Sequence, residues 1–274
     1  MDETTLTRVR IVLVEPAGAR NVGAVARVMK NMGLRQLVLV NPQCDRLCEE
    51  AVHMAVHALD VLEQAQVVAT MPEALSGCTR AIATTARVRS IETNLENPRT
   101  ALPWLIAEPV SSALIFGPED RGLSNAELNY AQRFVRIATN PEYPSLNLAA
   151  AVGICCYELY SSVISELSSC QVELSDFNNL ATFQSDNIET PTETAPLELL
   201  EGYYQQMEAV LLKMGYLYPH TATSRMEKFR RIFNRGNLSK EEVAMLRGIF
   251  SQMDWALQFL PESAIGDRKQ QDAP

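Results

Sequence analysis

Short apolar runs alternate with helical patterns through the first 168 residues of the chain. The runs are continuous and rich in Val, Ile and Leu, which predicts strands covered on both faces. Between them, apolar residues recur every three or four positions, as at Val22, Val25, Ala26 and Met29 of a helix expected at 21–32. Strands are expected at 10–14, 37–40, 66–70, 80–84, 113–116 and 134–138. The pattern predicts an α/β fold, a parallel sheet with helices on both faces.

The pattern changes twice in the remainder of the chain. After a long helical pattern at 146–167, residues 169–195 are rich in Asn, Ser, Thr, Glu and Asp and contain no Lys or Arg, which is typical of an acidic flexible linker. Three more helical patterns follow, at 197–214, 224–233 and 240–260. We therefore expect an α/β domain at 1–168, an acidic linker at 169–195, a small all-helical extension at 196–262 and a disordered tail at 263–274.

The composition is that of a soluble globular protein, with 47% hydrophobic and 21% charged residues. Because the net charge is −9, a nucleic acid would have to bind at a local basic patch. The first residues are acidic and polar, and the apolar run Ile11–Val14 is too short for a signal peptide or a membrane span. We expect a cytoplasmic protein without a membrane partner, whose six cysteines are reduced and partly buried.

Two motifs for other chemistry are incomplete. The segment Gly18–Gly23 has the glycine spacing of a phosphate-binding loop, but the Lys-Ser/Thr pair that should follow is missing. His53 and His57 have the spacing of a zinc pair on a helix, but Met54 stands where a metalloprotease carries its general-base glutamate. We expect neither a metal site nor an ordinary Rossmann dinucleotide site.

Three loops rich in Gly and Asn each follow an expected strand and precede an expected helix. They are Glu15–Gly23, Gly117–Asn125 and Asn140–Leu148. Ligands bind at the carboxyl ends of strands in open α/β sheets, so the three loops could share one site. Any one loop alone is better explained as a turn or a helix cap. The third has two prolines, a tyrosine, a serine and two asparagines in nine residues, a density that favours a site.

These loops carry three ordered motifs: Asn21-Val-Gly-x-x-x-Arg27, Phe116-Gly-x-Glu119 and Asn140-Pro-x-Tyr-x-Ser-Leu-Asn-Leu148. In this order they resemble the motifs of SPOUT-class RNA ribose 2′-O-methyltransferases, and most closely those of the TrmJ-like branch. The resemblance runs from about residue 8 to 160 and returns weakly at 224–249. It implies a trefoil knot near the end of the α/β domain, S-adenosylmethionine as cofactor, and a homodimer packed across the knot.

The resemblance also implies which residues hold the cofactor, largely through backbone groups. These are Thr84, Thr85, Ala86, Gly117, Ile137, Pro144, Ser145 and Leu146.

The chemistry of ribose methylation limits the roles that side chains can take. A methyl group passes from a sulfonium to a ribose hydroxyl, so the protein must align the hydroxyl and help to remove its proton. By resemblance, Arg27, Ser145 and Asn21 are the catalytic candidates. Arg27 stays protonated and would stabilise developing charge rather than act as a base. Asn147 would orient groups, and Glu119 would brace a loop. Without the motif, Arg27 is equally well read as a solvated helix residue.

Two basic segments are candidates for RNA binding. Arg87 and Arg89 follow the strand at 80–84 and could clamp the RNA backbone, or be ordinary loop charges. The segment 225–235 has five basic residues and one acid, with apolar residues on one helical side, and Arg225, Lys228 and Arg231 are its expected RNA contacts. An amphipathic helix with a charged exterior would look the same.

The expected function is S-adenosylmethionine-dependent methylation of a ribose 2′-hydroxyl in tRNA, at cytidine or uridine 32 of the anticodon loop. Two alternatives stay open at this point. The same reaction could act on another tRNA nucleotide or on ribosomal RNA. The chain could also be a knotted RNA-binding protein without catalysis, although the presence of Arg27, Ser145 and the complete third loop argues against this.

Overall fold

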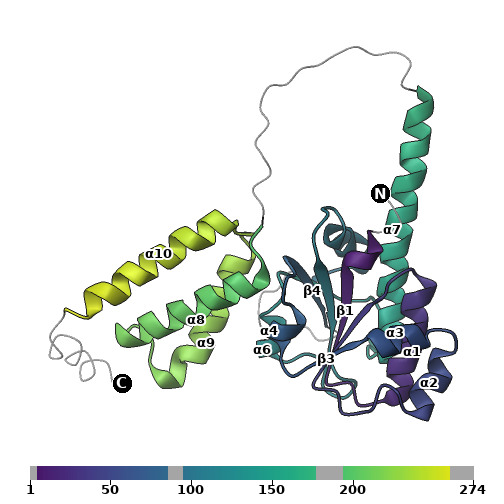
Figure 1. Ribbon diagram of the computed structural model, residues 1–274, viewed down its shortest axis with the longest axis horizontal. Helices are drawn as coiled ribbons and strands as arrows, with labels where there is room; N and C mark the ends of the chain where they lie inside the picture. Colours follow the sequence, from purple (N-terminus) through teal and green to yellow (C-terminus); the bar gives the residue numbers. More distant parts are fainter. Residues whose placement is uncertain (1–4, 86–94, 177–193, 260–274) are drawn as a thin grey trace. The chain divides into compact units, whose positions relative to one another are not determined.

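The computed structural model describes residues 5–85, 95–176 and 194–259, which fall into two compact units, Met1–Thr190 and Pro191–Pro274 (Figure 1). The division between the units lies inside the expected linker. The predictions for Ala86, Arg87, Arg89, linker residues 177–193 and the tail lie outside the described residues.

The described part of the first unit forms a seven-stranded sheet in which every neighbouring pair is parallel. The strand order is β3-β2-β1-β6-β4-β7-β5. The strands are β1 Val9–Val14, β2 Gln36–Val40, β3 Gln66–Val68, β4 Arg80–Thr84, β5 Leu95–Glu96, β6 Ser112–Phe116 and β7 Arg133–Val135. The predicted parallel α/β sheet is confirmed, and β5 is an edge strand that the sequence reading missed because it has only two residues.

Helices cover the sheet on both sides (Figure 1). One side of the sheet is covered by α1 Ala19–Asn31, α2 Glu49–Ala55, α3 Leu59–Gln64 and α7 Leu148–Asp176. The short helices are η1 Leu6–Arg8, α4 Met71–Ala74, α5 Pro98–Ala101, η2 Leu102–Leu105 and α6 Asn125–Leu128. Helices α2 and α3 are separate, because Val56 takes a positive φ of 54° and ends α2.

Helix α7 is longer and more central than the sequence indicated. It runs to Asp176, past the expected domain end at 168, since residues 169–176 contain neither glycine nor proline to end it. Its segment Leu148–Ser165 has the length and mean hydropathy, 1.5, of a membrane span. One side of this segment is core, packed against α1 and α5. The core residues that it contributes are Leu148, Val152, Cys155, Cys156, Leu159 and Val163.

The second unit contains the three expected helices, α8 Leu197–Lys213, α9 Pro219–Asn234 and α10 Lys240–Leu257. Helix α9 begins five residues before the predicted start at 224, with Pro219 in its first turn, where a proline loses no backbone hydrogen bond. Helix α10 begins with a capping box of Ser239 and Glu242. Helix α8 packs against both α9 and α10, and its buried Tyr204 hydroxyl donates to Asn234 Oδ1 at 2.7 Å.

Candidate active site

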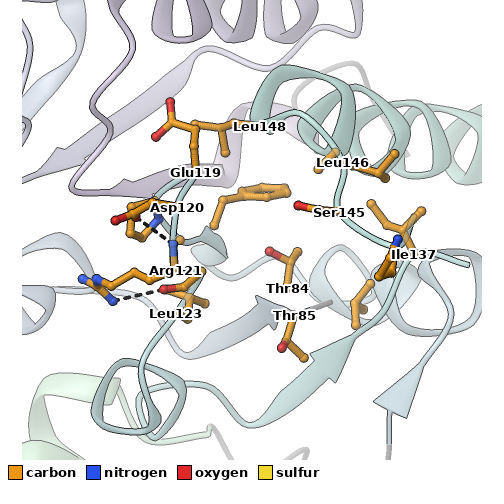
Figure 2. Close-up of a pocket in the computed structure, with 17 residues that line it drawn as sticks. Thr84, Thr85, Glu119, Asp120, Arg121, Leu123, Ile137, Ser145, Leu146 and Leu148 are labelled. Carbon is orange, nitrogen blue, oxygen red and sulfur yellow. Dashed lines mark hydrogen bonds between the residues drawn. The ribbon is translucent and has the colours of Figure 1, made fainter. Parts of the chain in front are cut away.

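The first unit has a pocket at the carboxyl ends of β4, β6 and β7, where parallel strands present loops to a ligand (Figure 2). The space inside it, part of which is open to solvent, is about 840 Å³. Three segments wall it: the end of β4, the loop after β6, and the segment that joins β7 to α7. Its lining residues are Thr84, Thr85, Phe116–Leu123, Val135, Ile137, Pro144–Leu146, Leu148 and Ala151.

Every described residue expected to hold the cofactor lines this pocket. These are Thr84, Thr85, Gly117, Ile137, Pro144, Ser145 and Leu146. The pocket also includes the stretch Pro118–Leu123, part of the loop Gly117–Asn125 that the sequence placed at a shared site, although only Gly117 of this loop was expected by number to hold the cofactor. The glycines in this loop were the available signal for a close backbone approach.

The loop after β6 is folded tightly on itself. A Cβ on Gly117 would lie 2.3 Å from the backbone nitrogen of Leu123, so only glycine fits there. Gly122 has a positive φ of 65°, and its N–H donates to Pro118 O at 2.9 Å. The loop therefore presents a fixed row of backbone groups to the pocket.

Arg121 holds that loop to the end of β1. Its guanidinium donates to Glu15 Oε2 at 2.6 Å and to both carboxylate oxygens of Glu127 at 2.9 Å. Glu127 also accepts from Ser124 N in the capping box of α6. Hydrogen bonds that Arg121 donates to these two carboxylates, Glu127 first and then Glu15, raise the pKa of Arg121 more than their charge does. Arg121 therefore stays charged over the physiological pH range.

A chain of hydrogen bonds connects the three motifs. Glu119 Oε1 accepts from Asn21 Nδ2 at 2.8 Å, and Asn21 Oδ1 accepts from Asn147 Nδ2 at 3.0 Å. Asn147 Oδ1 in turn accepts from Ala149 N at 2.9 Å and so caps α7. These bonds connect Asn21 to Glu119, 98 positions later in the sequence, and to Asn147, 126 positions later. We call Glu119, Asn21 and Asn147 the motif relay.

The Glu119 carboxylate in the motif relay is stabilised in its charged form. Burial opposes ionisation, but hydrogen bonds from the Asn21 amide and from the backbone N–H groups of Ala17 and Gly18 outweigh it and lower the pKa. A lowered folded-state pKa adds stability above the unfolded-state pKa, and that stability is lost as pH falls through the folded-state value. Glu119 is therefore ionised at neutral pH, and it accepts the hydrogen bonds of the relay as a carboxylate.

The three catalytic candidates do not meet in one place. Ser145 lines the pocket and points into it in Figure 2, and its hydroxyl has no hydrogen-bond partner within the described residues. Asn21 lies beside the pocket, where it lines a separate groove with Arg20, Asn147 and neighbouring residues. Arg27 is exposed on α1 and lines neither space.

The expected basic surface is present on α9 of the second unit. Arg225 and Lys228 are exposed, and Arg231 is half-buried, 3.8 Å from Glu227. Arg230 of the same helix is instead used internally, with two short contacts to Glu201 of α8. The described residues contain no cluster of three or more His, Cys, Asp or Glu side chains that could hold a metal ion.

The pocket suits S-adenosylmethionine in the chemistry of its lining. Segments Gly117–Leu123 and Pro144–Leu146 line it, and backbone groups in such segments can meet the hydrogen-bonding edge of an adenine. Val135, Ile137 and Leu148 contribute apolar lining. Thr85 and Ser145 also line the pocket (Figure 2). An apolar cradle with a few convergent polar groups is typical of a small-molecule site.

Comparison with known proteins gives two family matches that together cover most of the chain. Residues 8–157 match the SpoU rRNA Methylase family, and residues 198–265 match the C-terminal domain of the tRNA methyltransferase TrmJ. The first match covers the sheet and all three motifs, and the second covers α8, α9 and α10.

Individual relatives extend over nearly the full chain. A tRNA (cytidine/uridine/adenosine-2′-O-)-methyltransferase TrmJ of Pseudomonas aeruginosa is 39% identical over 251 residues, 90% of this chain and 94% of that protein. A tRNA (cytidine/uridine-2′-O-)-methyltransferase TrmJ of Salmonella typhimurium is 37% identical, over 91% of this chain and 97% of that protein. The crystal structure of TrmJ from Z. mobilis ZM4 matches with a TM-score of 0.75 and 29% identity, over 89% of this chain and 98% of that one.

Proposed function

The chain belongs to the SpoU rRNA Methylase family, in its TrmJ branch, and we propose that it transfers a methyl group from S-adenosylmethionine to a ribose 2′-hydroxyl of tRNA. One observation carries the proposal. The motif relay joins all three family motifs beside a pocket whose lining suits the methyl donor. The two relatives named above act on cytidine and uridine in tRNA, which supports the same nucleotides here, with position 32 of the anticodon loop as the proposed target.

Each candidate residue of this chain would have a separate role in the reaction, set by its position. When bound, S-adenosylmethionine supplies the electrophilic methyl group. Ser145, with a free hydroxyl at the pocket, would hydrogen-bond the ribose hydroxyl and direct its lone pair. The motif relay would keep the Ser145 loop in place through the capped start of α7. Arg27 would stabilise the alkoxide or the adjoining phosphate once RNA is bound.

Three finer features belong to the same proposal. The segment between β7 and α7, which forms a wall of the pocket, would take part in a trefoil knot. Two subunits would pack through the side of α7 that is not core, where apolar side chains are exposed. Those exposed residues are Ile154, Tyr157, Tyr160 and Ile164. The enzyme would act in the cytoplasm, where its tRNA substrate is.

The reaction is tested directly by mapping ribose methylation. tRNA from a strain that lacks the gene, incubated with the purified protein and S-adenosylmethionine, should gain a 2′-O-methyl group at cytidine or uridine 32. A reaction without S-adenosylmethionine is the control, and ribosomal RNA from the same strain is treated in parallel. Unchanged tRNA would contradict the proposal, and methylation confined to ribosomal RNA would transfer it to that substrate.

Replacing Ser145 with alanine tests the proposed positioning of the hydroxyl. We expect kcat for methyl transfer to fall about 10- to 100-fold, because one transition-state hydrogen bond to a charged oxygen is lost. Affinity for S-adenosylmethionine should stay within about threefold, since Ser145 is expected to contact the cofactor mainly through its backbone. Single-turnover kinetics and calorimetry measure the two effects separately. A Ser145→Thr variant, which keeps a hydroxyl, should recover part of the rate.

A further inference from the structure

The second unit has an apolar groove of its own, between α9 and α10 with α8 as its floor. Its volume is about 660 Å³, and the exposed surface that lines it is entirely apolar. In Figure 1, α8 lies between the two other helices of this unit. The lining residues are Tyr203, Met207, Leu211, Tyr216, Phe229, Phe233, Leu246, Ile249 and Phe250.

Aromatic rings dominate this groove. Tyr203 is fully buried at its floor, with Phe233 edge-on to it at 5.4 Å and Phe250 at 5.8 Å between ring centroids. Tyr216 stands at the rim, 53% exposed, with its centroid 6.3 Å from that of Phe229. The Tyr203 hydroxyl is buried without a hydrogen-bond partner among the described residues. The floor therefore contains one polar group that the described fold does not use.

A positive rim lies along the α9 side of the groove. The Arg225 guanidinium lies over the Tyr216 ring, 5.6 Å from its centroid, and donates to Tyr216 O at 3.0 Å. Arg225 is one helical turn before Phe229, so cation and ring occupy adjoining positions on the helix surface. Exposed Lys228 and Arg235 follow on the outer side of the same helix. An anionic chain can thus run along α9 while an apolar group enters the groove.

We propose that this groove takes the unstacked base of a single-stranded RNA nucleotide, with its phosphates on Arg225 and Lys228. The inference rests on the proposed action on tRNA. Aromatic rings and guanidinium planes beside a cationic track are the features that bind splayed-out bases in single-stranded RNA. A neutral or basic protein segment would fill the apolar groove but would not use the positive rim, whereas RNA uses both.

Tyr216→Ala in the full-length protein is the main test, with affinity for a fluorescent unmodified tRNA measured without S-adenosylmethionine. We expect affinity to fall about tenfold, the loss of one base–aromatic contact, with an unchanged salt dependence because no phosphate contact is removed. Trp255→Ala is the matched control: Trp255 is 54% exposed on α10 and does not line this groove, so affinity should not change. Phe229→Leu keeps apolar volume but removes a ring, and should also weaken binding.

A second measurement distinguishes base recognition from charge. A pentamer of uridylate and an abasic ribose-phosphate pentamer have the same phosphates, so Tyr216→Ala should weaken only the first. Unchanged tRNA affinity, an equal loss for both pentamers, or a change in oligomeric state would overturn the groove assignment. If the wild-type protein methylates tRNA while Tyr216→Ala binds it normally, only this inference falls. If the wild-type protein binds no tRNA, the proposed function falls with it.

Discussion

Arg27→Ala should bind S-adenosylmethionine as well as the wild-type protein and transfer the methyl group about 100- to 1,000-fold more slowly, the usual loss for a charge-stabilising group. The two halves of this result have separate reasons. Arg27 does not line the pocket and makes no hydrogen bond or ion pair with its walls among the described residues, so the cofactor site should be undisturbed. An exposed arginine in the middle of α1 without a carboxylate partner among the described residues is available to a phosphate or an alkoxide.

Calorimetry with S-adenosylmethionine and single-turnover transfer to tRNA measure the two effects in one preparation. Arg35→Ala is a suitable control, because Arg35 is also exposed in the first unit but lies outside α1 and all three motifs. Arg27→Lys should recover only part of the rate, since an ammonium group lacks the two-pronged geometry of guanidinium. Loss of cofactor binding would show that Arg27 has a different role, and an unchanged rate would remove it from the catalytic set.

Gly117→Ala should weaken S-adenosylmethionine binding by about 100-fold. The new Cβ would lie 2.3 Å from Leu123 N and 2.4 Å from the carbonyl carbon of Gly122, and a backbone contact of this kind cannot be relieved by a side-chain rotation. The loop must shift, at a cost of about 1–3 kcal/mol. This loop is one wall of the pocket, so the cost of shifting it lowers the affinity for the cofactor. A cost of about 3 kcal/mol corresponds to an affinity roughly 100-fold weaker.

Gly153→Ala provides the comparison for Gly117→Ala. A Cβ on Gly153 meets only the Val28 methyl groups, at 3.7 Å and 4.0 Å, which is ordinary packing on α7. This variant should bind S-adenosylmethionine normally and be slightly more stable, since alanine favours the helix. Calorimetry and thermal unfolding of both variants are the measurements. Equal affinities for the two would show that the loop after β6 does not hold the cofactor.

The sheet could be predicted from the sequence because its strands are continuous apolar runs. Ile11, Val38, Ile82 and Leu114 are all fully or almost fully buried, as strands between two helical layers require. The two-residue β5 could not be predicted, since two residues carry no periodicity. The break between α2 and α3 could not be predicted either, because Val56 is a β-branched residue at a positive φ, a conformation that such residues rarely adopt. The strand order is a tertiary property that no local pattern contains.

The segments of the candidate site could be predicted because three loops of distinctive composition follow one another in a characteristic order along the chain. The three loops predicted which segments would meet, and the pocket and the motif relay contain those segments. The clamp from Arg121 to Glu15 was not foreseen, because Glu15 lies 106 positions away and both residues are ordinary surface types. For Arg27 the sequence motif predicts a catalytic role, but in the structure of one chain its side chain lies outside the pocket.

The strand order has a consequence for how the chain is made. Strands β1, β2 and β3 are neighbours in both sequence and space, so they can assemble as soon as they leave the ribosome. The free edge of β1 stays unpaired until β6 has been synthesised, and β4 can join the sheet only after β6 has paired with β1. During synthesis the nascent chain therefore exposes an unpaired parallel edge of Val9–Val14, a surface that chaperones protect. The last pocket wall, Pro144–Leu146, follows every strand, so the methyl donor cannot assist the early steps of folding.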